Sequence, residues 1–209
     1  MCYRGDLSMA DTCIQKAQYL LSKLANPDPA LIISIYYAHL LIHEIRKEFY
    51  EMYNLANKST EIARTNNWPM QIISQYDIAE YYYYVGRYDE AKELFQSLIT
   101  ASIEHGYHRR PISGWLYLAK IALCLGNMDE AEKHLQQGEE QAKEIQHQYH
   151  IAESKRIRSQ LHFLRGDFGK ARIALVESID LFERLGMRRE LAETREELRR
   201  IKAGEMPVV

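Results

Sequence analysis

Residues 86–91 read GRYDEA, and this phrase recurs along the chain. The other copies are GDLSMA at 5–10, GNMDEA at 126–131 and GDFGKA at 166–171, together with a degenerate copy, KEFYEM, at 47–52. The last three complete copies begin forty residues apart. A phrase repeated at a fixed period of this length is typical of a chain built from stacked supersecondary units.

A second series of residues has the same period: Asn26, Asn66, Gly106, Gln146 and Gly186. Because Asn and Gly tolerate the left-handed conformation that ends a helix, this series and the glycines of the phrase are expected to mark helix ends. The segments between them have apolar residues at three- and four-residue spacing, as in Trp115, Leu118 and Ala122, which indicates helices. We expect helices at about 6–25, 29–45, 48–65, 69–85, 88–105, 110–125, 128–145, 149–165, 168–185 and 188–202.

The recurring phrase resembles the tetratricopeptide repeat, and the resemblance covers nearly the whole chain. In that family a glycine ends the first helix of a hairpin, a large apolar residue starts the second, and a small alanine lets the two helices approach closely. The matching alanines are Ala10, Ala91, Ala131 and Ala171, and the bulky residues four positions later are Ile14, Phe95, Leu135 and Leu175. The usual repeat has roughly 34 residues, and this longer form resembles the arrays of bacterial signalling proteins such as maltose-regulator-like transcription activators.

The resemblance implies an all-α fold, a right-handed superhelical solenoid of antiparallel helical hairpins with about ten helices. We expect a single array over 1–203, with an incomplete first repeat at 1–26, full repeats at 29–66, 69–106, 109–146 and 149–186, a capping helix at 187–203 and a frayed tail at 204–209. The degenerate copy lacks its Gly and its Ala, so its hairpin is expected to be splayed. In the last full repeat, Ile157, Leu161 and Leu164 indicate that the core face has rotated, because Lys155 and Arg158 occupy positions that are usually apolar.

Charge and composition exclude several classes of function. Lys and Arg number 27 against 29 Asp and Glu, so no electrostatic reason favours nucleic acid or an anionic membrane as a direct partner. No apolar run approaches the roughly 18 residues of a membrane helix. The three cysteines have no CxxC spacing, which favours reduced thiols and a cytoplasmic location.

No catalytic motif is present in the sequence. The phosphate-binding loop and the dinucleotide fingerprint do not occur, and the HExxH pattern that begins at His43 fails because Lys47 stands at its fifth position. His39 and His43 lie four residues apart and could share a metal, but two histidines on a packed helix are more often structural. We therefore expect no enzyme activity, no metal and no cofactor.

Four consecutive tyrosines, 81–84, sweep most of the circumference of a helix and cannot share one face. Alignment to the repeat assigns Tyr82 and Tyr88 to the core, whereas Tyr83 and Tyr84 fall on positions that line the concave groove in this family. The rest of the predicted partner-binding groove comprises Tyr37, Leu41, Tyr76, Asp77, Glu80, Leu116, Tyr117, Lys120, Cys124, Arg156, Gln160 and Phe163. The competing interpretation is that these residues are simply solvated or packed among themselves.

The array begins with the second helix of a hairpin, so one of its faces is expected to lack a cover. That possible self-association face comprises Leu7, Ala10, Ile14, Ala17 and Leu21. Three hypotheses for the function follow. The first is a scaffold or sensor module of a bacterial regulatory system that binds a protein or peptide in the groove; the second is a homodimerisation module that uses the N-terminal face; the third is a small-ligand sensor.

Overall fold

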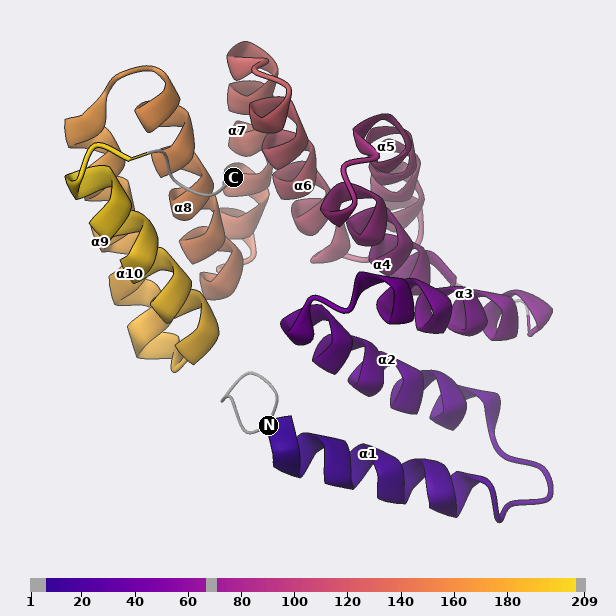
Figure 1. The fold of residues 1–209 in the computed structure, drawn as a ribbon. Helices are drawn as coiled ribbons and strands as arrows, with labels where there is room; N and C mark the ends of the chain where they lie inside the picture. The colour runs from indigo at the N-terminus through magenta and orange to yellow at the C-terminus, as the bar shows by residue number, and fades with distance from the viewer. Residues whose placement is uncertain (1–6, 67–70, 206–209) are drawn as a thin grey trace. The chain divides into compact units, whose positions relative to one another are not determined.

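The computed structural model describes residues 7–66 and 71–205, which form helices joined by short turns (Figure 1). The helices are α1 (Leu7–Leu21), α2 (Pro29–Arg46), α3 (Phe49–Thr65), α4 (Gln71–Tyr84), α5 (Tyr88–Glu104), α6 (Arg110–Cys124), α7 (Met128–Glu144), α8 (Gln148–Leu164), α9 (Phe168–Leu185) and α10 (Arg188–Lys202). The all-α prediction and nearly all of the predicted boundaries are confirmed. The predicted start at Pro69, the phrase residues Gly5 and Asp6 and most of the predicted tail, 206–209, lie outside the described residues.

The chain divides into two compact units, Met1–His105 with α1–α5 and Gly106–Val209 with α6–α10. Within each unit consecutive helices pack against each other as hairpins, and in the second unit α6 also packs against α8. No helix in the described part of the chain is both long and apolar enough to cross a membrane. A single array over 1–203 stays a prediction.

Left-handed residues end the first helix of each hairpin, as the glycine pattern predicted. Gly86 has a φ of +77°, and Lys47 takes the same position in the degenerate copy with a φ of +60°. Gln146, the non-glycine of the second series, is also left-handed, with a φ of +53°. The expectation is wrong for Asn26, which is not left-handed and lies beyond the end of α1, and for Asn66, whose φ is −99°. Its side-chain amide instead donates to the carbonyl of Ile62 at 2.8 Å, so the side chain satisfies the helix end.

The small and large residues of the phrase pack the hairpins together. Ala91 and Phe95 are both fully buried, and the matching pairs on α7 and α9 are buried in the same way. In the degenerate copy the order is reversed, because Met52 stands at the alanine position and Ala56 at the bulky one, and both are fully buried. They form one cluster with Leu40. The expected splaying is therefore absent: exchanging a large for a small residue conserves the volume that fills the hairpin.

The rotated core face of α8 is confirmed. Ile157 and Leu161 are buried in the core cluster that α6 and α7 also supply. The charged residues at the usually apolar positions have carboxylate partners instead. Arg158 pairs with Glu132 at 2.7 Å and with Glu139 at 2.7 Å, both on α7. The two bonds to Glu139 are bidentate, which fixes the register of α8 against α7.

The expected N-terminal association face is only partly open. Ala10 and Ile14 are buried, 5% and 8% exposed, in a cluster with Ile42 of α2. The expectation that they lack a cover is wrong, since α2 provides one. Leu7, Ala17 and Leu21 are half-buried.

Candidate peptide-binding surface

Charged side chains connect α6, α8 and α10 across one surface of the second unit. Lys120 of α6 pairs with Glu153 of α8 at 2.6 Å. Three residues further along α8, Arg156 pairs with two carboxylates of α10. We call this the α6–α8–α10 surface; it comprises Tyr117, Lys120, Glu153, Arg156, Gln160, Glu193 and Glu197. It contains four of the predicted groove residues and brings them into one chain of contacts.

Arg156 is the most strongly held member of this surface. Its guanidinium lies 2.5 Å from Glu197 and 3.0 Å from Glu193. Burial alone would lower the pKa of Arg156, but the two carboxylates outweigh it and raise that pKa. Burial raises the pKa of Glu197, whose side chain is 3% exposed, although Arg156 acts in the opposite direction. The ion pair thus holds a carboxylate that would otherwise be expensive to bury.

Lys120 is held from two sides. Its ammonium lies 2.6 Å from Glu153 and 4.5 Å from the ring centroid of Tyr117, one turn earlier on α6. Burial would raise the pKa of Glu153, but the positive charges of Lys120 and its neighbours lower it overall. The lysine side chain is held by these contacts and remains 20% exposed, so part of it is accessible to a ligand. An ordered, accessible donor loses little entropy when a ligand binds to it.

His150 lies at the start of α8, one turn before Glu153. Its Nε2 and the hydroxyl of Ser113 on α6 are 3.1 Å apart. Its ring lies 4.4 Å from that of His147. Burial lowers the pKa of His150 to about 4, with smaller contributions from nearby charges. The imidazole is therefore neutral at physiological pH and joins α8 to α6 through a neutral hydrogen bond.

Gln160 of this surface and three further predicted groove residues of the unit are packed rather than presented. Gln160 is 5% exposed, and its amide lies 3.5 Å from Glu197. Phe163 packs on the core cluster shared by α9 and α10, and its ring meets Phe168 edge-on at 5.2 Å. Leu116 is fully buried. Cys124 is half-buried with a free thiol.

In the first unit, the prediction that Tyr76 lines an open groove is wrong. Tyr76 is fully buried, its ring lies 5.9 Å from Phe95, and its hydroxyl accepts a hydrogen bond from Ser102 at 3.3 Å. It therefore belongs to the α4–α5 hairpin core. Asp77 is 5% exposed and presents little surface. Tyr37 is 36% exposed, and Leu41 and Glu80 are half-buried, so these three keep surface that a partner could contact.

The side chains of the tyrosine run contact two neighbouring helices, α3 and α5. Tyr81 stacks on Tyr53 of α3 at 4.4 Å, and Tyr84 stacks on Phe49 at 4.5 Å, with ring planes 11° apart. Tyr84 thus joins α4 to α3 rather than lining an open groove. Tyr83 meets the ring of Tyr88 at 6.0 Å and is half-buried.

The two tyrosines predicted for the core are only partly enclosed. Tyr82 and Tyr88 are both half-buried. The guanidinium of Arg87 lies 4.6 Å from the ring centroid of Tyr82, which covers part of that ring from the solvent side. Burial raises the pKa of Tyr82, and its hydrogen bond with Tyr53 adds to the effect.

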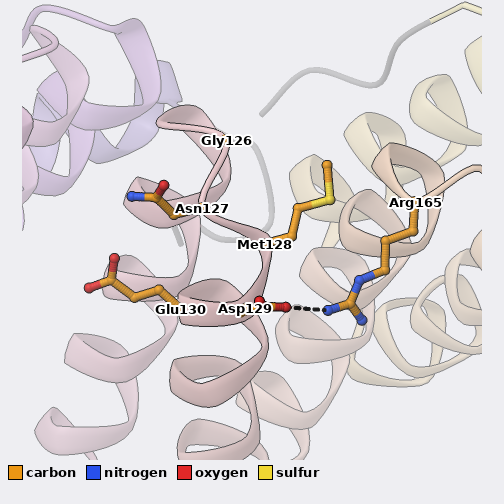
Figure 2. A pocket seen from close by; sticks show the side chains of 6 residues that line it. All are labelled: Gly126, Asn127, Met128, Asp129, Glu130 and Arg165. Carbon is orange, nitrogen blue, oxygen red and sulfur yellow. Dashed lines mark ion pairs between the residues drawn. The ribbon is translucent and has the colours of Figure 1, made fainter.

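An open depression of about 510 Å³ lies at the turn between α6 and α7 (Figure 2). It is lined by Gly126, Asn127, Met128, Asp129, Glu130 and Arg165. Arg165 pairs with Glu132 at 2.6 Å and approaches Asp129 at 3.7 Å, so its charge is compensated within the chain. None of the lining residues belongs to the α6–α8–α10 surface.

The histidine pair of α2 has partners within the chain. The rings of His39 and His43 lie 4.4 Å apart. Nδ1 of His39 is 3.3 Å from the amide of Gln18, and Nδ1 of His43 is 2.6 Å from Glu48. Within residues 7–66 and 71–205, no three His, Cys, Asp or Glu side chains gather in a way that could hold a metal ion.

Sequence reasoning missed the three acidic members of the surface: Glu153, Glu193 and Glu197. The sequence contained one usable signal for Glu153, which is three residues before Arg156 on the same helix. The other two carboxylates belong to α10, which looks like a simple polar cap in the sequence. Only the packing of α10 on the earlier helices places them beside Arg156.

Comparison with solved structures shows the fold. The crystal structure of BtubC (BKLC) from P. vanneervenii has a TM-score of 0.61 at 14% identity and covers 98% of this chain and 92% of its own. RapI in its apo form has a TM-score of 0.67 at 16% identity over 87% of this chain. A Rap protein complexed with competence and sporulation factor has a TM-score of 0.62 at 16% identity over 97%. No family model and no curated protein sequence matches the chain.

The fold is tetratricopeptide-like. The Rap proteins are helical repeat proteins of this kind, and the chain shares their arrangement of helical hairpins. This chain spans 66% of the length of RapI and 60% of the Rap protein solved with its peptide. At identities of this order the likeness is one of fold.

Proposed function

We propose that this protein is a non-enzymatic binding scaffold of a bacterial regulatory system, and that it holds a peptide or protein segment on the α6–α8–α10 surface. The observation that carries the proposal is the chain of cross-helix ion pairs from Lys120 to Glu193. A similar helical repeat protein has been solved with competence and sporulation factor bound, which supports a peptide as the ligand class. The forty-residue period also resembles that of maltose-regulator-like activators, and this resemblance supports a role in a bacterial regulatory system.

The chemistry of the surface suits a peptide. Lys120 and Arg156 are partly exposed and offer N–H donors, and Glu193, whose side chain is 45% exposed, offers acceptors. A peptide backbone carries one donor and one acceptor per residue, so an extended segment can satisfy both kinds of group. The surface carries two basic and three acidic side chains, so its charge does not select for a polyanionic ligand. The ion pairs fix the side chains before binding, which reduces the entropic cost of association.

The proposal is tested with a displayed library of random peptides. Peptides are selected on the wild-type chain and then measured against Lys120→Met and Glu193→Gln, which alter the surface at partly exposed positions. Lys133→Met is the matched control, because Lys133 is an exposed lysine on α7 outside the surface. We expect each surface variant to weaken binding by about tenfold or more, as loss of one charged hydrogen bond does. The control should bind as the wild type does.

A second variant tests the first unit separately. Tyr83→Ala removes a half-buried ring at the end of α4. A loss of binding would assign a separate contribution to the half-buried Tyr83 of the first unit. Selected peptides that bind both Lys120→Met and Glu193→Gln as tightly as the wild type would refute the proposed location. Circular dichroism and chemical unfolding confirm beforehand that each variant is folded.

A further inference from the structure

A stripe of exposed residues with two apolar side chains at its centre runs along one face of α9. Its members are Gly169, Ile173, Val176 and Asp180, spaced four, three and four residues apart, so they share one face of the helix. Ile173 is 62% exposed and Val176 is 54% exposed. The opposite face of α9, with Ala171 and Leu175, is buried in a cluster with Ile201 of α10, the helix beside α9 in Figure 1. Two β-branched side chains at the centre of an exposed face are unusual on a helix that is otherwise well packed.

The other hairpins show what these positions normally carry. One repeat earlier, α7 has Lys133 and Gln136 at the equivalent positions, and α5 has Glu93 and Gln96. All four are exposed, like their counterparts on α9. Exposure at these positions is therefore a property of the repeat and not of α9 being near the end of its unit. What is particular to α9 is the replacement of polar by apolar residues.

The stripe is complementary to itself in an antiparallel arrangement. The four, three, four spacing is symmetric about the midpoint between Ile173 and Val176. When two copies of α9 pack antiparallel about that midpoint, Ile173 of each meets Val176 of the other, and Gly169 meets Asp180. A Cβ built on Gly169 would have no atom of the chain within 4 Å, so this end of the stripe is open to a close approach. This is the pattern of an isologous contact, in which residue i meets j and j meets i.

The charges beside the stripe favour the same arrangement. Lys170 and Arg172 lie in its N-terminal half, and Glu177 and Asp180 in its C-terminal half. An antiparallel pair brings the basic half of one helix beside the acidic half of the other, whereas a parallel pair would align like charges. Lys170 and Asp180 have neighbours on their own helix or turn, but their side chains remain 66% and 55% exposed and can reach a second copy.

We propose that a second copy of this chain covers the stripe, and that the protein forms a two-fold symmetric dimer through antiparallel packing of α9 on α9. This interface is separate from the proposed binding function, since none of its residues belongs to the α6–α8–α10 surface. It also differs from an N-terminal interface, whose expected centre is already covered by α2.

The first test measures the mass of the chain by sedimentation equilibrium over a wide range of concentration. We expect the wild type to pass from monomer to dimer as the concentration rises. Ile173→Glu with Val176→Glu should remain monomeric, because it places four carboxylates at the centre of the interface. Lys133→Glu with Gln136→Glu is the matched control at the equivalent positions of α7, and it should dimerise like the wild type. The proposal is overturned by a wild type that stays monomeric throughout, or by continued dimerisation of the double variant of α9.

The second test uses the distribution of charge along α9, which is basic in the N-terminal half of the stripe and acidic in its C-terminal half. An acidic variant, Lys170→Glu with Arg172→Glu, and a basic variant, Glu177→Lys with Asp180→Lys, should each lose dimerisation when alone at low salt. In an antiparallel pair of identical copies, each variant brings like charges of the two helices together. Mixing the two should restore a dimer that contains one copy of each, because opposite charges then meet on both sides. Failure of the mixture to associate, with both variants folded by circular dichroism, excludes the antiparallel arrangement.

Discussion

Arg156 of α8 and Glu197 of α10 form an ion pair at 2.5 Å in which the carboxylate side chain is 3% exposed. The pair holds the last helix to the one two positions earlier in the chain. A carboxylate buried to this degree is tolerated only because a guanidinium faces it, and the raised pKa of Glu197 reflects its burial.

Removing Arg156 is therefore expected to cost more than removing Glu193. We expect Arg156→Met to lower the free energy of unfolding by about 3 kcal/mol, since it leaves Glu197 buried without a partner. Glu193→Ala should cost less than about 1 kcal/mol because Glu193 is 45% exposed. Arg156→Met with Glu197→Met should recover most of the loss. Urea unfolding followed by circular dichroism measures all three, and a double variant no more stable than Arg156→Met would contradict this account.

Lys47 holds a backbone conformation that favours glycine. Its φ is +60°, at the position where Gly86 has +77° in the next hairpin. Lys47→Gly should raise the free energy of unfolding by up to about 1 kcal/mol, because it removes the strain of a Cβ in the left-handed region. Gly86→Ala should lower it by about 1 kcal/mol for the same reason. The midpoints of thermal unfolding should move in opposite directions, and a shift in the same direction for both would be inconsistent with the cause given.

The stacking of Tyr84 on Phe49 predicts an energetic coupling between two hairpins. The ring centroids are 4.5 Å apart and the planes are nearly parallel. In a double-mutant cycle of Phe49→Ala and Tyr84→Ala, we expect a coupling of about 1 kcal/mol. Phe49→Leu serves as a comparison that keeps apolar bulk without the ring, and it should lose only part of this energy. Additive effects of the two alanine substitutions would assign Tyr84 to a different neighbour.

His150 predicts a loss of stability in mild acid. Its pKa is lowered from the ordinary 6.5 to about 4 in the folded chain. Between those two values the unfolded chain binds a proton that the folded chain does not, so the free energy of unfolding falls as the pH decreases through this window. The full decrease in the free energy of unfolding across this window is about 3 kcal/mol. In His150→Gln the difference in stability between neutral and mildly acidic pH should shrink by a large part of this amount, as measured by urea unfolding at each pH. An unchanged pH profile would exclude His150 as its source.

Much of the fold could be predicted because it depends on local rules. The glycines at 86, 126 and 166 mark helix ends through backbone conformation alone, and each has a φ between +76° and +80°. The exchange of Met52 and Ala56 shows the limit of such reasoning. A motif comparison treats that copy as defective, whereas the volume that fills the hairpin depends on both residues together.

The candidate site was predicted less well. The repeat alignment named Lys120 and Arg156, but it gave no information on their carboxylate partners. It also placed Tyr76 on a groove, although the side chain is fully buried. Which helix covers a side chain depends on how hairpins stack, and this is not encoded in the position of a residue within its own repeat.

By itself the sequence determined the helices, their ends and the hairpin as the repeating unit, because backbone propensity and apolar periodicity act over a few residues. Tertiary structure alone decided which charges meet. Arg156 and Glu197 are forty-one residues apart, and only the packing of α10 brings them within 2.5 Å. Ion pairs form between groups that are close in space, and at that separation in sequence only the stacking of helices sets the distance.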